Sequence, residues 1–143
     1  MSPAYGTLGN VPAIFPFPPG HTFLAFNAEA VLAGEYSQQV ALPPGPTAGA
    51  KGIRVVIDAS AAPGAGEFYV MEGDNDPAGS ADYVQVPSGG DLAFGNITAG
   101  PNGAGTRWTS DLIPVAGQFV CLYCKTAPSN AGIKITARIT RAA

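Results

Sequence analysis

The chain has 143 residues, of which 46% are hydrophobic and only 12% are charged, and its formal net charge is −3. A domain of this length buries about 70% of the surface that its unfolded chain exposes, so it can build a core without metals or disulfides. The acidic balance argues against a nucleic-acid-binding protein, because such proteins carry a basic stripe that neutralises phosphates.

The first 20 residues differ from the rest of the chain. They contain five prolines and the apolar residues Val11, Ile14, Phe15 and Phe17, but no charged side chain. Proline favours an extended backbone of about 3.1 Å per residue, so this segment can reach on the order of 60 Å. Exposed phenylalanines are a liability in a free monomer. We therefore expect an arm whose apolar side chains are buried against a neighbouring subunit or, alternatively, against its own domain.

From residue 21 onward the apolar residues recur with a period of two, which predicts strands. The clearest strand is expected at 133–140, where Ile and Ala alternate with Lys, Thr and Arg. Residues 53–58 alternate similarly, and at 119–124 both faces are apolar, as in a central strand covered on both sides. The composition of residues 21–33 would allow a helix, although residues 22–26 read better as a strand. Further strands are expected at 68–71, 83–86, 92–97 and 107–113.

Clusters of Pro and Gly separate these segments, at 43–46, 63–66, 87–90 and 100–103. Such residues mark turns and loops. Short strands at this regular spacing predict two packed sheets. We therefore expect an all-β chain with two parts: an extended Pro-rich arm over residues 1–20, and a single jelly-roll or β-sandwich domain of about eight antiparallel strands over residues 21–143.

Cys121 and Cys124 form a C-x-x-C pair, a spacing that in a turn or at a helix start indicates a metal or redox site. Here the pair falls within an expected strand, where residues three apart point to opposite faces. The sequence holds no second cysteine pair to complete a zinc site. We therefore interpret both residues as buried structural cysteines.

The sequence offers little for catalysis. His21 is the only histidine, so any Ser-His-Asp or Cys-His arrangement would need it, and it follows a Pro-Pro-Gly run between arm and domain. The segment from Asp74 to Asp82 begins like a calcium loop, but Ala78 and Gln85 occupy the fifth and twelfth positions, where ligands are required. No Gly-rich run ends in Gly-Lys-Ser/Thr, as in a phosphate loop. We expect no enzymatic activity, no cofactor and no metal.

The charged residues are segregated along the chain. No basic residue lies between Arg54 and Arg107, whereas four of the five charged residues after Arg107 are basic. The two regions can pair within the domain or between copies, or they are ordinary solvated loops and strand faces. A surface this low in charge suits permanent contact with other proteins, since neutral groups cost less to desolvate than charges. Exposed Ala, Gly and Pro explain the composition equally well.

No apolar run approaches the roughly 18 residues of a membrane span. No basic residue precedes the first apolar segment, as one would in a signal peptide. We therefore expect the chain not to associate with a membrane. We also expect it to be synthesised in the cytoplasm of the host.

Two consecutive segments resemble a family of small structural proteins from tailed bacteriophages and prophages. The run Gly52-Ile53-Arg54-Val55-Val56-Ile57-Asp58 is similar to the family's G-V-x-V-V-I-D strand, and residues 68–79 are similar to its V-x-V-x-G-x-D-x-x-x-G strand and turn. The family then has a Pro-containing segment and two closing strands. Leu112-Ile113-Pro114 and the strands expected at 119–124 and 133–140 lie where that pattern puts them. The likeness covers roughly residues 34–143.

A Pro-rich arm followed by a β domain also resembles the jelly-roll cement proteins that clamp capsid shells. The resemblance implies a capsid cement or decoration protein on the virion surface, bound to the major capsid protein and present as a homo-oligomer, a dimer or trimer. It brings no catalytic residues. It does not extend to residues 1–33, so the docking role of the arm follows from composition alone. The predicted interface residues are Ile14, Phe15, Phe17, Phe23 and Phe26.

The alternative function is glycan binding by a β-sandwich of a phage fibre or head appendage. Trp108 and Tyr83 would be its sugar-stacking platforms. A single Trp in an all-β chain is also an ordinary core residue.

Overall fold

The computed structural model describes residues 14–16, 22–41, 51–73, 83–87, 89–94, 98–99, 106–117 and 119–141. Within these ranges the chain forms twelve strands and no helix, which confirms the predicted all-β class. The same ranges contain no helix long and apolar enough to cross a membrane.

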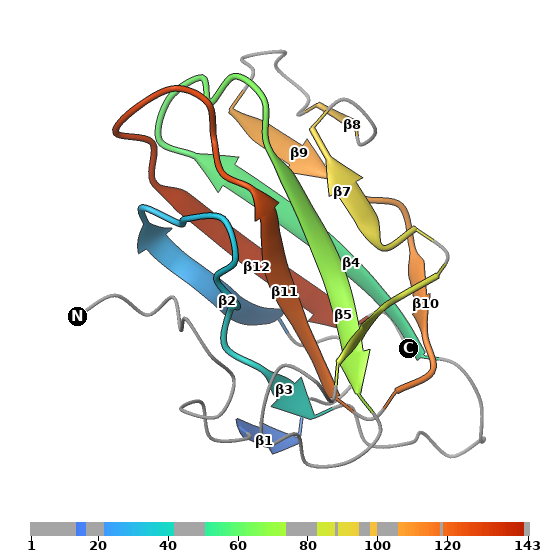
Figure 1. Cartoon of the computed structure of the whole chain (residues 1–143). Coiled ribbons are helices and arrows are strands. Elements are labelled where there is room, and N and C mark those ends of the chain that lie inside the picture. Colours follow the sequence, from blue (N-terminus) through green and yellow to red (C-terminus); the bar gives the residue numbers. More distant parts are fainter. Residues whose placement is uncertain are drawn as a thin grey trace.

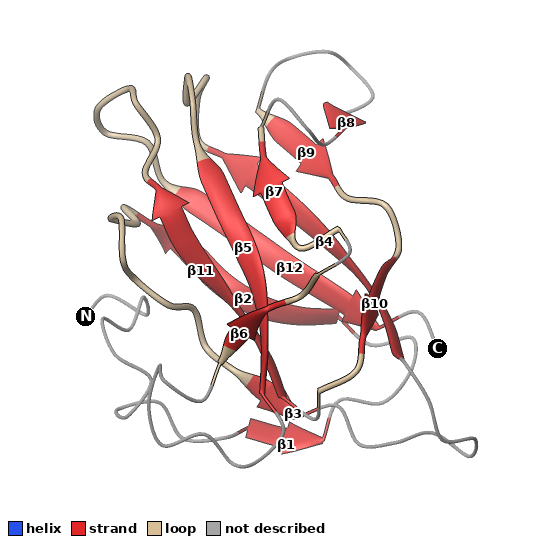
Figure 2. Cartoon of the chain, turned by 45° about the vertical axis from the view of Figure 1, so that its right-hand side comes forward, coloured by secondary structure: helices blue, strands red, loops and turns tan. Residues whose placement is uncertain are grey.

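Two sheets pack face to face as a β-sandwich (Figures 1 and 2). The first sheet contains, in order across it, β1 (Ile14–Pro16), β3 (Val40–Ala41), β11 (Phe119–Thr126), β5 (Glu67–Gly73) and β6 (Val84–Gln85), with β7 (Asp91–Ala93) also paired to β5. The second contains β2 (Thr22–Glu29), β12 (Ile135–Arg141), β4 (Lys51–Ala59), β9 (Arg107–Thr109) and β8 (Thr98–Ala99), with β10 (Ile113–Val115) also paired to β4.

The strand pairs are antiparallel except that β1 runs parallel to β3. The prediction of a sandwich is confirmed. The number of strands exceeds about eight because several have only two or three residues and add to the edges of the sheets or to the ends of longer strands.

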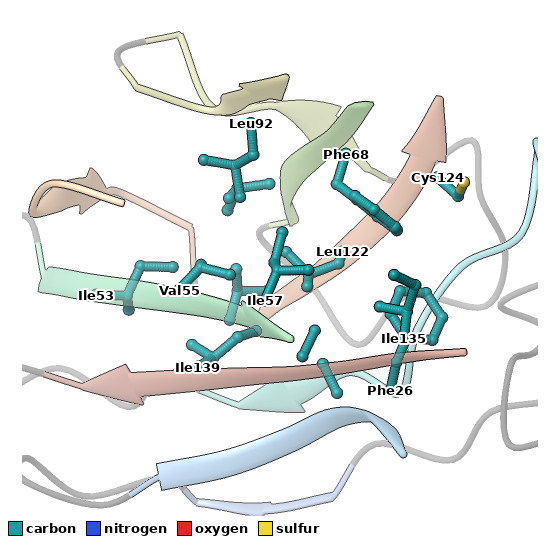
Figure 3. Packing of buried hydrophobic residues seen from close by; sticks show 14 of the residues in the cluster. Phe26, Ile53, Val55, Ile57, Phe68, Leu92, Leu122, Cys124, Ile135 and Ile139 are labelled. Carbon is teal, nitrogen blue, oxygen red and sulfur yellow. The ribbon is translucent and has the colours of Figure 1, made fainter. Parts of the chain in front are cut away.

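The core fills the space between the sheets (Figure 3). On β12 every second side chain is buried, as the alternating sequence predicts. The pairing of β12 with β4 sets Ile139 opposite Val55 and Ala137 opposite Ile57, so both strands turn the same face inward. Each large apolar side chain buried in this way stabilises the fold by about 1.5–3 kcal/mol.

One expected strand, residues 107–113, is divided into β9 and β10, and Ser110 lies at the division. The Ser110 N–H donates to the Val55 carbonyl at 2.9 Å, and Ser110 Oγ accepts the Val55 N–H at 2.9 Å. The same hydroxyl donates to the Asp111 carbonyl at 2.8 Å. The side chain therefore takes the place of a strand carbonyl, which keeps the buried Val55 amide satisfied where the strand breaks.

In the first sheet, the Ser37 side chain likewise takes the place of a strand carbonyl. Its N–H donates to the Leu122 carbonyl, its Oγ accepts the Leu122 N–H, and the hydroxyl donates to the Gln38 carbonyl, each at 2.8 Å. This pattern holds the segment between β2 and β3 against β11. It also fixes the neighbouring Tyr36 beside Tyr123, with which Tyr36 forms an isolated bridge.

β2 shows that the helix alternative for residues 21–33 is wrong. Its register with β12 shifts twice, with an extra residue of β2 between Leu24 and Phe26 and another between Phe26 and Glu29. In the second bulge Ala28 has a φ of 53°, and its N–H donates to Oγ1 of Thr136 at 3.1 Å. Bulges bend an edge strand and discourage pairing with a foreign sheet.

Of the predicted arm, the structure describes residues 14–16. They form β1, with Ile14 opposite Val40 and Pro16 opposite Ala41 on β3 of the same chain. For these three residues the backbone therefore lies against its own domain. The rest of residues 1–20 lies outside the described residues.

Candidate functional site

The five predicted interface residues lie in different surroundings. Phe26 is fully buried in the core, where its ring packs against another core phenylalanine. Phe23 is half-buried and packs against the same core. Ile14 and Phe15 lie on β1 at the edge of the first sheet, and Phe17 lies outside the described residues. Phe26 therefore supports the fold and has no side-chain surface left for a partner.

Aromatic side chains gather on the outer face of the first sheet. The register of β5 and β11 sets Tyr69 opposite Tyr123 and Met71 opposite Cys121. The three tyrosine rings form a row, with centroids 4.7 Å apart for Tyr36 and Tyr123 and 6.2 Å apart for Tyr69 and Tyr123. We use the name aromatic face for five half-buried side chains of this surface: Tyr36, Tyr69, Met71, Phe119 and Tyr123.

Tyr83 lies across part of this outer surface. It immediately precedes β6, and its hydroxyl donates to Oε1 of Gln39 at 2.7 Å. Gln39 immediately precedes β3, so the hydrogen bond spans β5 and β11. Both side chains are buried, and Tyr83 and Cys121 form a small cluster separate from the main core. The chain thus covers one part of this face and leaves the tyrosine row partly open.

The two cysteines lie on opposite faces of β11, as predicted. Cys124 belongs to the main core and Cys121 to the outer cluster, and both are free and buried. Burial raises the pKa of the Cys121 thiol well above its ordinary value. Burial and the nearby Glu35 carboxylate raise the pKa of Cys124 to about 12. Neither thiol therefore provides a thiolate nucleophile at neutral pH.

The two sugar-stacking platforms predicted for the glycan alternative are wrong. Trp108 is 6% exposed and stacks within the sandwich on Phe94, with ring centroids 4.2 Å apart and planes 11° apart. Tyr83 is 5% exposed. A ring needs an open face to stack on a sugar, and neither residue has one.

The outer face of the second sheet is polar and basic. Arg54, Arg107 and Arg138 lie on β4, β9 and β12, and Lys134 immediately precedes β12; all four are exposed. Asp58 on β4 accepts two hydrogen bonds from Arg107, at 2.5 and 3.3 Å, and one from Arg138 at 3.0 Å. Such exposed pairs contribute at most about 1 kcal/mol each. This face carries an excess of positive charge on a chain that is negative as a whole.

The two remaining candidate sites from the sequence are the histidine and the calcium-like loop. His21 and residues 74–82, the calcium-loop candidate, lie outside the described residues. Within the ranges that the structure describes, no group of three or more His, Cys, Asp or Glu side chains is placed to hold a metal ion.

Comparison with known proteins adds no relative: no protein-family model, no curated protein and no solved structure matches the chain. The family resemblance seen in the sequence therefore remains a prediction.

Sequence reasoning did not identify the aromatic face as a site. Its signal was present in residues 119–124, where both faces of the strand are apolar, and in Tyr69 between two core residues. The same pattern is typical of a strand covered on both sides. Tyr36 carried no such signal, because its place beside Tyr123 depends on the hydrogen bonds of Ser37.

Proposed function

We propose that this chain is a non-enzymatic structural protein of a tailed-phage head, a cement or decoration protein that binds the shell of major capsid protein and acts as a homo-oligomer. The observation that carries the proposal is the aromatic face, a row of tyrosines on the outside of a domain with few charges. The family resemblance of the sequence supports the identity of the partner.

The aromatic face has the composition of a protein interface. Its five side chains bear no charge, so contact with a partner desolvates no ion. Aromatic residues and Met are enriched in interface cores, where a few of them provide most of the binding energy. The charged residues Glu67, Asp91 and Lys125 lie together near the ends of β5, β7 and β11. They form a polar group at one end of the aromatic face, as residues do in the polar rim of an interface.

The described part of the arm, β1, belongs to the sheet that bears the aromatic face. β1 is the edge strand of this sheet and is separated from β11 only by β3. Ile14 and Phe15 lie on that edge, and the apolar residues around them extend the contact in our proposal. Apolar burial provides about 25 cal/mol per Å². Repetition over many copies of a shell multiplies weak contacts into firm attachment.

The proposal is tested with shells assembled from the major capsid protein encoded in the same genome. Wild-type protein is expected to sediment with the shells, and the double variant Tyr69→Gln/Tyr123→Gln to bind roughly 30-fold more weakly, since the two interface aromatics together contribute about 2 kcal/mol. Arg54→Gln, on the opposite face, is the matched control and is expected to bind like the wild type. Unfolding by urea verifies that all three proteins are folded.

Two outcomes would overturn the proposal. One is wild-type protein that does not bind the shells, and the other is a folded double variant that binds as tightly as the control. Deletion of residues 1–13, which leaves β1 intact, measures the share of the arm in the same assay. Light scattering on the free protein tests the homo-oligomer.

A further inference from the structure

A cavity opens on the outer face of the second sheet, where β4 ends and β12 begins. Its volume is about 250 Å³, and its lining consists of Ala28, Asp58, Ala59, Ser60, Lys134 and Thr136. Pockets for drug-sized ligands have volumes of about 300–1,000 Å³. This cavity is therefore on the scale of one monosaccharide, and a bare carboxylate or phosphate would leave most of it empty.

Two hydroxyl groups on the wall are held in place by the main chain. Ser60 Oγ accepts the N–H of Lys134 at 2.9 Å, and Thr136 Oγ1 accepts the N–H of Ala28 at 3.1 Å. A hydroxyl that accepts in this way still has its own proton to donate. In the part of the chain that the structure describes, neither proton has a protein acceptor. The cavity therefore offers two positioned donors to a ligand.

The bulge of β2 forms the third side of the cavity. The left-handed φ of 53° at Ala28 costs a residue other than glycine about 1–2 kcal/mol. Residues held in such conformations cluster at functional sites. Ala28 is exposed and adds carbon surface beside the hydroxyls, whereas the side chain of Ala59, which also lines the cavity, belongs to the core between the sheets.

The charges around the cavity favour an anion. Lys134 has no ion-pair partner among the described residues. The one carboxylate on the wall, that of Asp58, already binds Arg107 and Arg138. The net local charge is positive, and the ammonium of Lys134 is the cation that remains to be neutralised.

We propose that this cavity binds an acidic monosaccharide, a sugar ring that bears a carboxylate. The Lys134 ammonium makes a charge-assisted hydrogen bond with the carboxylate. The hydroxyls of Ser60 and Thr136 donate to oxygens of the ring or its hydroxyls, and the carbon face of the ring lies against Ala28. This site is on the face opposite the aromatic face, so it is independent of the proposed attachment to a shell.

The test is a titration of the isotope-labelled full chain with glucuronic acid, followed by amide chemical shifts. Without an aromatic platform the binding is weak, and we expect saturable shifts at Ala28, Ser60, Lys134 and Thr136 with a Kd on the order of 1 mM. Glucose, which has the ring but no carboxylate, and acetate, which has the carboxylate but no ring, are each expected to bind at least about tenfold more weakly.

Variants localise the effect. Lys134→Gln removes the charge and keeps a polar side chain that is one atom shorter, and we expect it to weaken glucuronic acid binding about tenfold or more. Lys125→Gln, an exposed lysine on the first sheet, is the matched control and is expected to bind like the wild type. Absence of saturable shifts up to about 50 mM ligand, equal binding of glucose or acetate, or unchanged binding by Lys134→Gln would each overturn the proposal.

Discussion

The hydroxyl oxygen of Ser110 is the single atom whose removal is expected to have the clearest effect on the stability of the fold. Ser110→Ala removes the Oγ that accepts the Val55 N–H, and Val55 is 1% exposed while Ser110 is 6% exposed. Water cannot easily take the place of the lost acceptor, so the amide is left unpaired in the sandwich. An unpaired buried polar group costs about 1–3 kcal/mol, and we therefore expect a loss of about 2 kcal/mol in the free energy of unfolding.

Urea unfolding measures this loss, which corresponds to a fall of about 1 M in the midpoint at the slopes usual for small proteins. The matched control is Ser60→Ala. Ser60 Oγ also accepts one backbone N–H at 2.9 Å, that of Lys134, but at an exposed site where water replaces it. We expect the control to lose no more than about 0.5 kcal/mol. Equal losses in the two variants, with the Val55 amide still protected from hydrogen exchange in Ser110→Ala, would refute the role of the buried hydroxyl.

Three further predictions concern a bulge, the thiols and a carboxyl pair. Ala28→Gly relieves the left-handed backbone and is expected to raise the unfolding free energy by up to about 1 kcal/mol, whereas Ala30→Gly, outside the bulge, lowers it; thermal unfolding distinguishes them. The two buried cysteines are expected to resist a thiol reagent at pH about 8 until the protein is unfolded, and fast labelling of folded protein would contradict their burial. The hydrogen bond with Asp91 raises the pKa of Glu67 above its ordinary value of 4.5, so this pair favours folding at low pH and the contribution is lost as pH rises through the raised pKa. Glu67→Gln should therefore gain urea stability relative to wild type at pH 7 but not at pH 4, and an equal difference at both pH values would contradict the coupling.

The long strands could be predicted from the sequence because one side of each is buried. In β12 the alternation of Ile and Ala with Thr and Arg has a single interpretation, since a helix would scatter the apolar residues around its surface. β4 follows the same rule, and its pairing with β12 matches the two apolar sets. The opposite placement of Cys121 and Cys124 followed from the same period of two.

The short strands and the irregular sheet edges could not be predicted from the sequence in this way. β1 and β3 contain three and two residues, too few to show a period. The division between β9 and β10 depends on the Ser110 side chain, and serine is equally common in loops and turns. The bulges of β2 depend on its register with β12, more than 100 residues away along the chain. No local pattern contains that information.

The candidate binding surfaces could not be predicted from local sequence patterns either. Phe26 and Trp108 were plausible contact residues by type, but their exposure depends on which way β2 and β9 face, and both turn inward. The tyrosine row joins residues from three separate segments. The cavity beside Ala28 likewise needs β2, β4 and β12 together. Sites of this kind are a product of strand order, which alternation alone does not fix.

The proposed attachment to capsid shells is tested most directly by imaging shells that have been incubated with the protein. A cryo-EM reconstruction of major capsid protein shells incubated with this chain should show the sandwich at symmetry-related positions, with β5 and β11 turned toward the capsid protein and the arm at the same contact. Shells without added density, or with the β4 and β12 face turned toward the capsid protein, would contradict attachment through the aromatic face.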